Sequence, residues 1–310
     1  MTTVCQVKII IRNLTQKNSR ALLPSDRAMA VDSHNVHKRI EHTFSLDVED
    51  WYHGIPIAQP REQRMEVGMN FLMELFERSS VKVTMFWLGD AARQYPELLR
   101  QCVAAGHEIG SHALHHTFVY DSNPKKFHEE THAAKALLED ITGCAVRGFR
   151  APYFSITRSS EWALEVLAQL GFQYDSSIFP MRNVRYGIPN FSREPIIINT
   201  PSGKILEFPI SVRAFATKVI LPVSGGAYFR LYPYFLTKLN IQHHEKLNRS
   251  AVFYFHPWEA DPDHPRVAVD WKFRLTHYAN LGTAQQKLVR LFDDFSFTTL
   301  GRQANELFVP

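Results

Sequence analysis

The sequence predicts an α/β fold built on a parallel sheet, from about residue 42 onward. Short apolar and β-branched segments alternate there with amphipathic segments that are long enough for helices. Three of the helical segments are followed directly by a glycine, the residue that most often ends a helix: Gly106, Gly143 and Gly171. This alternation alone does not distinguish a barrel from an open sheet.

The expected elements follow one another closely as far as residue 170. Strands are expected at 43–48, 81–88, 107–111 and 146–150. Helices are expected at 61–79, 91–105, 124–142 and 159–170. In the first of these helices one face carries the apolar side chains of Val67, Phe71, Leu72, Leu75 and Phe76.

The second half of the chain is less regular. Six prolines between residues 180 and 230 interrupt the alternation, so long loops and one strand at 205–209 are expected there. Beyond them we expect a strand at 252–256, a loop, a helix at 283–294 and a last strand at 297–300. Long loops of this kind usually shape the access of a substrate to its site.

Composition is that of a globular enzyme. The chain has 310 residues, of which 45% are hydrophobic and 21% are charged. The net charge of +4 is spread evenly, with no basic run longer than two residues, which argues against a nucleic-acid partner. There is no apolar stretch of about 18 residues, so no transmembrane segment is expected.

Cysteine usage and the N-terminus favour a cytoplasmic location. The sequence contains three cysteines, Cys5, Cys102 and Cys144. They form no C-x-x-C pair and are odd in number, as expected for free thiols in a reducing compartment. Residues 1–40 lack a clear period and are expected to be a loose leader, too polar for a signal peptide. A single catalytic domain is expected at 41–310.

The most informative segment runs from Gly106 to His116 and contains two histidines four residues apart. At this spacing His112 and His116 can direct both imidazoles to one point. A group of carboxylates lies upstream, between residues 45 and 51. Two neutral imidazoles and one carboxylate give a divalent cation three protein ligands and leave positions open, an arrangement that suits metal-assisted hydrolysis.

Four further segments occur with this one in a fixed order. The five motif centres along the chain are Asp47, His112 with His116, Arg150 to Tyr153, Asp175 and His256. This order resembles the polysaccharide deacetylases, the NodB-homology domain of carbohydrate esterase family 4, over roughly residues 42–260. A finer resemblance is to the subgroup of bacterial exopolysaccharide gene clusters with a C-terminal extension. Its marks are Asp-Val-Glu-Asp-Trp51, Gly225–Arg230 and Phe255-His-Pro-Trp-Glu259.

The resemblance implies a distorted, incomplete (β/α)7 barrel with long loop insertions. The subgroup-specific loops and C-terminal part would cover about residues 180–310. In such a fold the loops at the carboxyl ends of the strands build the active site. Asp47, His112, Arg150 and His256 lie where expected strands end and loops begin, so we expect them at one shared mouth.

The resemblance also implies a role for each motif residue. Asp47 would be the general base that takes a proton from a metal-bound water, and His256 the general acid that protonates the leaving amine. Arg150 would orient Asp47, with Asp175 as its other partner. The backbone N–H of Tyr153 would donate to the developing oxyanion. Zn²⁺ is the expected cofactor, although Co²⁺, Fe²⁺ or Ni²⁺ would fit the same ligands.

The metal carboxylate is where the sequence departs from the family pattern. The family has two adjacent aspartates, but Val48 follows Asp47 here. Strand alternation favours Glu49 as the ligand, because residues two apart share a face. Asp50 keeps the residue type of the family, and a bulge after Asp47 would direct it inward. We slightly prefer Asp50 and expect the other acid to hydrogen-bond a ligand histidine.

Aromatic residues beside the motifs indicate the class of substrate. Trp51 and Trp258 are expected to stack on sugar rings, and Tyr153 to contact the substrate. The expected reaction is removal of an N-acetyl group from an amino sugar of a glycan or glycan precursor. Two alternatives remain open: the same chemistry on an acetylpolyamine or cyclic ureide, and a non-catalytic sugar-binding protein of this fold.

Overall fold

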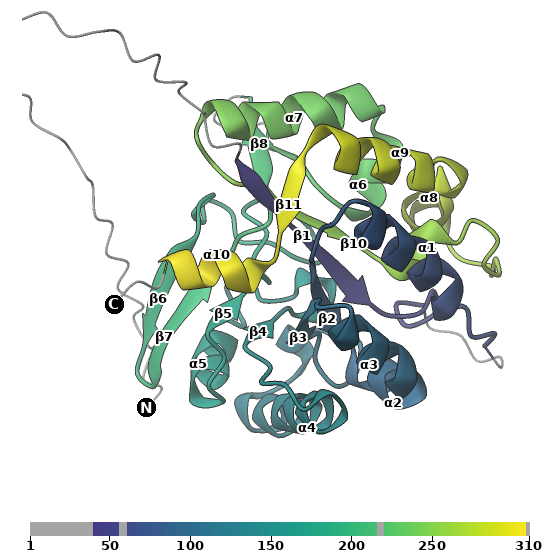
Figure 1. Ribbon diagram of the computed structural model, residues 1–310. Helices are drawn as coiled ribbons and strands as arrows, with labels where there is room; N and C mark the ends of the chain where they lie inside the picture. Colours follow the sequence, from purple (N-terminus) through teal and green to yellow (C-terminus); the bar gives the residue numbers. More distant parts are fainter. Residues whose placement is uncertain (1–39, 56–60, 216–219, 308–310) are drawn as a thin grey trace, which may run out of the picture.

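The computed structural model describes residues 40–55, 61–215 and 220–307 (Figure 1). Apart from residue 40, the expected leader at 1–40 lies outside these described residues. Within them, no helix combines the length and apolar character that crossing a membrane requires.

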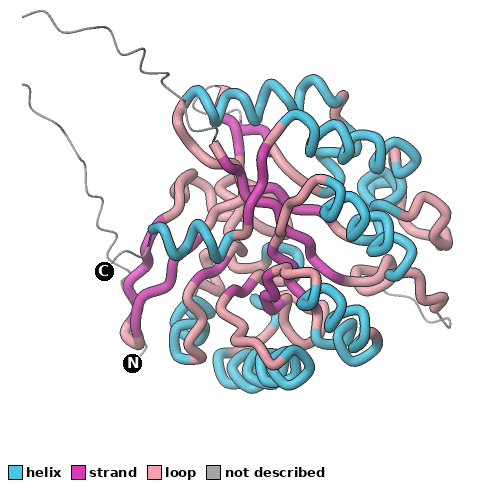
Figure 2. Tube along the Cα trace, viewed as in Figure 1, coloured by secondary structure: helices cyan, strands magenta, loops and turns pink. Residues whose placement is uncertain are grey.

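One large sheet organises the molecule, with helices around it (Figures 1 and 2). Its strands are β1 (Glu41–Val48), β2 (Thr84–Trp87), β3 (Glu108–Ser111), β4 (Gly148–Phe149), β5 (Tyr174–Asp175), β6 (Ile196–Thr200), β7 (Gly203–Glu207), β10 (Val252–Phe255) and β11 (Ser296–Thr298). They pair in the order β10-β1-β2-β3-β4-β5-β7-β6, and β11 also pairs with β1. Every pair is parallel except β6 with β7.

The α/β fold and the incomplete barrel are confirmed. Seven parallel strands, from β10 to β7 in the pairing order, form a curled half-barrel. In the described residues β10 and β6 stand at opposite ends of that order, so the sheet does not close on itself. Parallel strands end at one edge of a sheet, which places the motif residues after β1, β3, β4 and β10 at the same mouth.

Helices alternate with the first five strands, of which the sequence predicted the first four. They are α1 (Met65–Arg78), α2 (Gly89–Gln94), α3 (Pro96–Ala104), α4 (Pro124–Thr142) and α5 (Trp162–Gln169). The helix expected at 91–105 is divided in two. Tyr95 leaves the helical region, with φ −128° and ψ 54°, and Pro96 starts α3 because proline has no N–H to continue the preceding helix.

The core lies between β1 and the surrounding helices. Seven of the eight β1 residues are buried, because helices and neighbouring strands cover both faces of the strand. Phe44 is fully buried, and its ring is stacked with that of Phe253 from β10 at a centroid distance of 5.4 Å. Burying a side chain of this size contributes about 1.5–3 kcal/mol. This contact helps to fix β10 beside β1.

The C-terminal part contains more regular structure than the sequence predicts. Its helices and second sheet are α6 (Gly226–Leu231), α7 (Tyr234–Lys246), α8 (Trp271–Tyr278), α9 (Leu281–Asp294), α10 (Leu300–Leu307) and the hairpin β8 (Val212–Ala214) with β9 (Ile220–Pro222). This part extends the main sheet at both ends, since β7 pairs with β5 and β10 pairs with β1. The C-terminal part therefore supplies both ends of the half-barrel sheet.

Candidate active site

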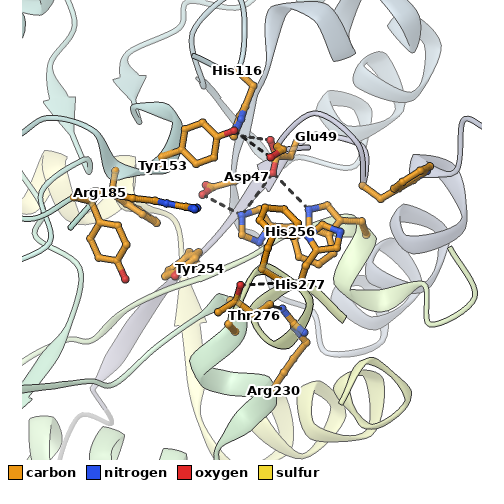
Figure 3. A pocket seen from close by; sticks show the side chains of 18 residues that line it. Asp47, Glu49, His116, Tyr153, Arg185, Arg230, Tyr254, His256, Thr276 and His277 are labelled. Carbon is orange, nitrogen blue, oxygen red and sulfur yellow. Dashed lines mark hydrogen bonds and ion pairs between the residues drawn. The ribbon is translucent and has the colours of Figure 1, made fainter. Parts of the chain in front are cut away.

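Three potential metal ligands converge where β1 and β3 end. Glu49 comes directly after β1, His112 comes directly after β3, and His116 lies in the loop that follows. One ligand atom from each residue lies within 4.8 Å of the other two. Oε2 of Glu49 and Nε2 of His116 are 2.8 Å apart (Figure 3). The predicted pair of histidines thus meets a carboxylate in one cluster.

Hydrogen bonding and burial favour the tautomer and the neutral form of His112 that a metal ligand needs. Its Nδ1 lies 2.8 Å from the carbonyl oxygen of Arg150, to which a proton on Nδ1 donates. That tautomer leaves the lone pair on Nε2 for a metal ion. Burial lowers the pKa of His112 to about 4, so the ring is neutral near pH 7.

Glu49 also fits the role of a metal ligand. Burial alone would raise the pKa of its carboxyl group, but three nearby histidines lower that pKa overall and keep the group ionised. They are His116, His256 and His112. Oε2 of Glu49 is buried and makes no regular hydrogen bond within the described residues. A buried, ionised carboxylate beside two imidazoles suits Zn²⁺ or a related divalent cation.

Asp50, which we slightly preferred as the ligand, is not part of this cluster. Its Oδ2 accepts hydrogen bonds from the backbone N–H of Arg64 at 2.9 Å and from the hydroxyl of Tyr95 at 3.0 Å. Its Oδ1 accepts from the N–H of Trp51 at 2.8 Å. The chain turns after Glu49, so Asp50 anchors the start of α1 and does not hydrogen-bond a ligand histidine. The alternation of side chains along the strand, which favoured Glu49, predicted the acid that lies beside the two histidines.

Asp47 and Arg150 form a buried ion pair on the other side of the cluster. Nη1 of Arg150 donates to Oδ1 of Asp47 and to the hydroxyl of Ser45, both at 2.7 Å. Asp47 is 2% exposed, and Arg150 is completely buried. An ion pair of this kind fixes the direction of the carboxylate. The predicted contact between these two residues is therefore present.

Asp175 is not the second hydrogen-bond partner of Arg150 that the family resemblance implied. Arg150 instead donates to the carbonyl and hydroxyl oxygens of Ser176, at 3.0 and 2.8 Å. Asp175 accepts a hydrogen bond from the hydroxyl of Ser177 at 2.5 Å and lies beside Glu207 on β7. Burial together with the Asp175 charge raises the pKa of Glu207 well above its usual range. The charge of Asp175 still acts on Arg150, but through space.

His256 faces the cluster from the end of β10. Its Nε2 lies 3.9 Å from Oδ2 of Asp47 and 3.8 Å from Oε1 of Glu49. Its Nδ1 lies 2.7 Å from Oε1 of Glu259. Glu259 in turn accepts a hydrogen bond from Nε of the buried Arg230 at 2.5 Å. The chain Arg230–Glu259–His256 holds this imidazole with Nε2 on the side of Asp47 and Glu49.

Arg230 and Glu259 received no role from the sequence, although both lie in segments that we singled out. The i, i+3 spacing of His256 and Glu259 was the available signal. In the structure the two residues form a capping arrangement, in which the Glu259 side chain also accepts a hydrogen bond from the backbone N–H of His256 at 3.1 Å. Arg230 is 29 residues away in sequence from Glu259, so spacing gave no indication of their contact.

A pocket of about 200 Å³ opens over these residues. Tyr153 lines it and has a left-handed backbone conformation, with φ 57° and ψ 14°. Such strain in a residue other than glycine is characteristic of functional turns. The next two amides donate to the carbonyls of Ala151 and Pro152, and within the described residues the N–H of Tyr153 makes no such backbone bond. That N–H is consequently free for an oxyanion.

The two tryptophans line the pocket, but both are largely buried. Trp51 is 3% exposed and donates its indole N–H to the carbonyl of Glu62 at 2.9 Å. Trp258 is 8% exposed and stacks with the rings of His256 and His277, at centroid distances of 5.1 and 4.2 Å. Its packing therefore positions the catalytic candidate His256, and stacking of Trp258 on a sugar stays a prediction.

Comparisons with known families divide the chain into two matched segments. Residues 67–174 match the family described as "Polysaccharide deacetylase", and residues 176–305 match "Domain of unknown function (DUF3473)". His112, His116 and Tyr153 lie in the first segment and His256 in the second, whereas Glu49 precedes both. The second segment thus supplies a residue of the same site.

Two curated relatives share part of this sequence. The peptidoglycan deacetylase of Helicobacter pylori is 30% identical over 113 residues, which are 36% of this chain and 38% of that protein. The chitooligosaccharide deacetylase of Azorhizobium caulinodans is 34% identical over 95 residues, 30% of this chain and 42% of that protein. The chain spans less than half the length of these relatives in the matched region.

The fold is also found among solved structures. A putative polysaccharide deacetylase from Mycobacterium smegmatis superposes with a TM-score of 0.56 at 17% identity. The alignment covers 92% of this chain and 94% of that one. At this level of identity the likeness establishes the fold alone.

Proposed function

This chain carries a polysaccharide deacetylase domain of the family 4 carbohydrate esterase type, and on this premise we propose that it is a metal-dependent N-deacetylase. The proposed substrate is an N-acetylated amino sugar in a glycan or glycan precursor. The observation that carries the proposal is the meeting of Glu49, His112 and His116 between two candidate proton-transfer groups. Those groups are Asp47 and His256.

The proposed metal site consists of Glu49, His112 and His116. A divalent cation there, for which we propose Zn²⁺, would supply Lewis-acid activation of water and of the acetyl carbonyl. Glu49 contributes the negative charge, and the Arg150 carbonyl orients His112 through Nδ1. The three ligands come from the loops after β1 and β3, and Glu49 and His116 also line the pocket in which the amide group would bind.

We propose Asp47 as the general base. Arg150 holds its Oδ1, which leaves Oδ2 on the side of His256 to accept a proton from the attacking water. His256 would then donate a proton from Nε2 to the departing nitrogen while Glu259 stabilises the imidazolium from Nδ1. The free N–H of Tyr153 would hydrogen-bond the oxygen that becomes negative during attack.

The biological setting is a further part of the proposal. The C-terminal segment and its motifs support a role in exopolysaccharide synthesis, through the resemblance described above. A cytoplasmic place of action is supported by the free thiols of Cys102 and Cys144. The substrate could then be a precursor rather than a finished polymer.

The direct test is acetate release by the metal-loaded protein. The screen includes N-acetylglucosamine oligomers, nucleotide- and lipid-linked N-acetyl sugars, acetylpolyamines and a cyclic ureide, the last assayed by ring opening. Acetate release from sugars that is lost in Asp47→Asn would support the proposal. Turnover confined to the polyamines or the ureide would replace the substrate class, and no turnover with a fully loaded metal site would contradict an enzymatic role.

A further inference from the structure

Arg185 brings a positive charge to the mouth of the active-site pocket. It lies in the loop between β5 and β6 and is one of the residues that line the pocket. Its side chain extends from that loop toward the space above Asp47 and Tyr153 (Figure 3). The residue itself is exposed, so a solute entering the pocket can reach its guanidinium.

The other fully charged side chains of the pocket have partners. Asp47 pairs with Arg150, Glu49 contacts His116, and Arg230 pairs with Glu259. In the described part of the chain, no hydrogen bond or ion pair is made by the Arg185 guanidinium. Only its backbone N–H is engaged, by the side chain of Asn183 at 3.0 Å. The charge of Arg185 is thus uncompensated at the entrance.

The neighbours of Arg185 confirm where this charge acts. Tyr153 and Tyr186 line the same pocket as Arg185. Tyr153 packs edge-on against His116 at a centroid distance of 4.2 Å. Arg185 therefore lines the same pocket as Glu49 and His116 of the proposed metal site.

We propose that Arg185 recognises an anionic group on the substrate, so that this chain selects an acidic N-acetylated glycan or precursor. The inference rests on the proposed deacetylase function and adds its substrate class. A guanidinium binds carboxylate and phosphate through two parallel hydrogen bonds, and an unpaired cation at a pocket mouth attracts anions from solution. The anion is either the carboxylate of an adjoining uronic acid or the phosphate of a carrier-linked sugar.

The same loop offers a matched control. Arg182 is also exposed but does not line the pocket. Arg182→Gln and Arg185→Gln therefore remove the same charge from the same loop and differ only in position. Arg185→Lys keeps the positive charge but removes the planar guanidinium that can donate two parallel hydrogen bonds.

Binding is measured by isothermal titration calorimetry on the metal-loaded full chain, which does not depend on turnover. The probes are an N-acetylglucosamine disaccharide, a disaccharide of glucuronic acid and N-acetylglucosamine, and N-acetylglucosamine 1-phosphate. We expect the native protein to bind at least one anionic probe roughly three- to tenfold more tightly than the neutral one, with the preference reduced by salt. The preferred anionic probe identifies the source of the anion.

Arg185→Gln should abolish this preference, Arg185→Lys should weaken it, and Arg182→Gln should retain it. An equal preference in Arg185→Gln, tighter binding of the neutral probe by the native protein, or no measurable binding of either anionic probe would overturn the inference. Anionic preference without acetate release from any sugar would refute the deacetylase proposal and leave the recognition by Arg185 standing.

Discussion

His256 and Glu259 are joined by a 2.7 Å contact between Nδ1 and Oε1, three residues apart at the end of β10. Burial alone would lower the pKa of His256, but Glu259 and then Glu49 and Asp47 raise it overall. Arg230 keeps Glu259 charged from the other side, because its guanidinium offsets the effect of burial on that carboxyl. The structure therefore favours a protonated imidazole in the position proposed for the general acid.

Replacing Glu259 by Gln should shift the pH profile. The general acid must be protonated, and loss of the Glu259 charge lowers the pKa of His256, so a smaller fraction is protonated at any given pH. The basic limb of kcat/KM should move to lower pH by roughly one pH unit. The acidic limb should stay in place. A basic limb that does not move would mean that another group supplies the proton.

Replacing His256 by Ala should reduce kcat by about 10²–10⁴-fold, the usual contribution of one general acid. Metal content and melting temperature should change little, since the ring is a pocket residue and not one of the three clustered ligands. Metal analysis and thermal unfolding serve as controls. A loss of activity that merely follows a loss of folded protein would indicate a structural histidine.

The two acids after Val48 should behave differently when changed one at a time. Glu49→Ala, like His112→Ala, should lose the bound cation, which elemental analysis would detect. Asp50→Ala should retain the cation but lower the free energy of unfolding by about 1–3 kcal/mol, because buried donors at the start of α1 lose their acceptor. Retained metal in Glu49→Ala would refute our assignment.

Asp47→Asn should keep the metal and lose turnover, since the amide cannot accept the proton from water. A loss of about 10²-fold or more in kcat is expected for removal of a general base. The matched readouts are acetate release and metal stoichiometry on the same sample. If the cation is lost together with activity, Asp47 is a ligand and its proposed role is wrong.

Stability should fall in mild acid through His107. Nδ1 of this buried ring accepts the backbone N–H of Val83 at 3.3 Å, and burial lowers its pKa from 6.5 to about 4. Between these values the unfolded chain binds the proton and the folded chain does not, so stability is complete above about pH 6.5 and declines toward pH 4. The melting temperature of His107→Gln should fall less from pH 7 to pH 5 than that of the native protein. Equal falls would exclude this contribution.

The first half of the fold could be predicted because its helices and strands carry regular periods. The helix expected at 124–142 has the same bounds as α4, which an Asn123 cap and a left-handed Gly143 delimit. Helix α7 was missed, because its buried face includes polar residues and shows no apolar period. These are Thr237, Asn240 and His244. Their burial depends on neighbours distant in sequence, which a local pattern does not contain.

The sequence predicted those parts of the site that follow from the type of a residue and from its position at the end of a strand. Asp47, His112, His116 and His256 meet as expected because parallel strands end together. Asp50 and Asp175 were misplaced because a turn and a neighbouring strand decide where their side chains go. The residue type of a ligand is thus easier to infer from sequence than the neighbouring residues that orient its side chain.

The pairing of β1 with β10 has a consequence for how the site is assembled. The hydroxyl of Thr43 on β1 donates to the carbonyl of Ala251, 208 residues along the chain. Closing so long a loop costs chain entropy that only the finished contact offsets. The proposed metal ligands all lie within that loop, between residues 43 and 251, whereas His256 follows β10. The proposed general acid therefore joins the metal-binding cluster only through the pairing of β10 with β1.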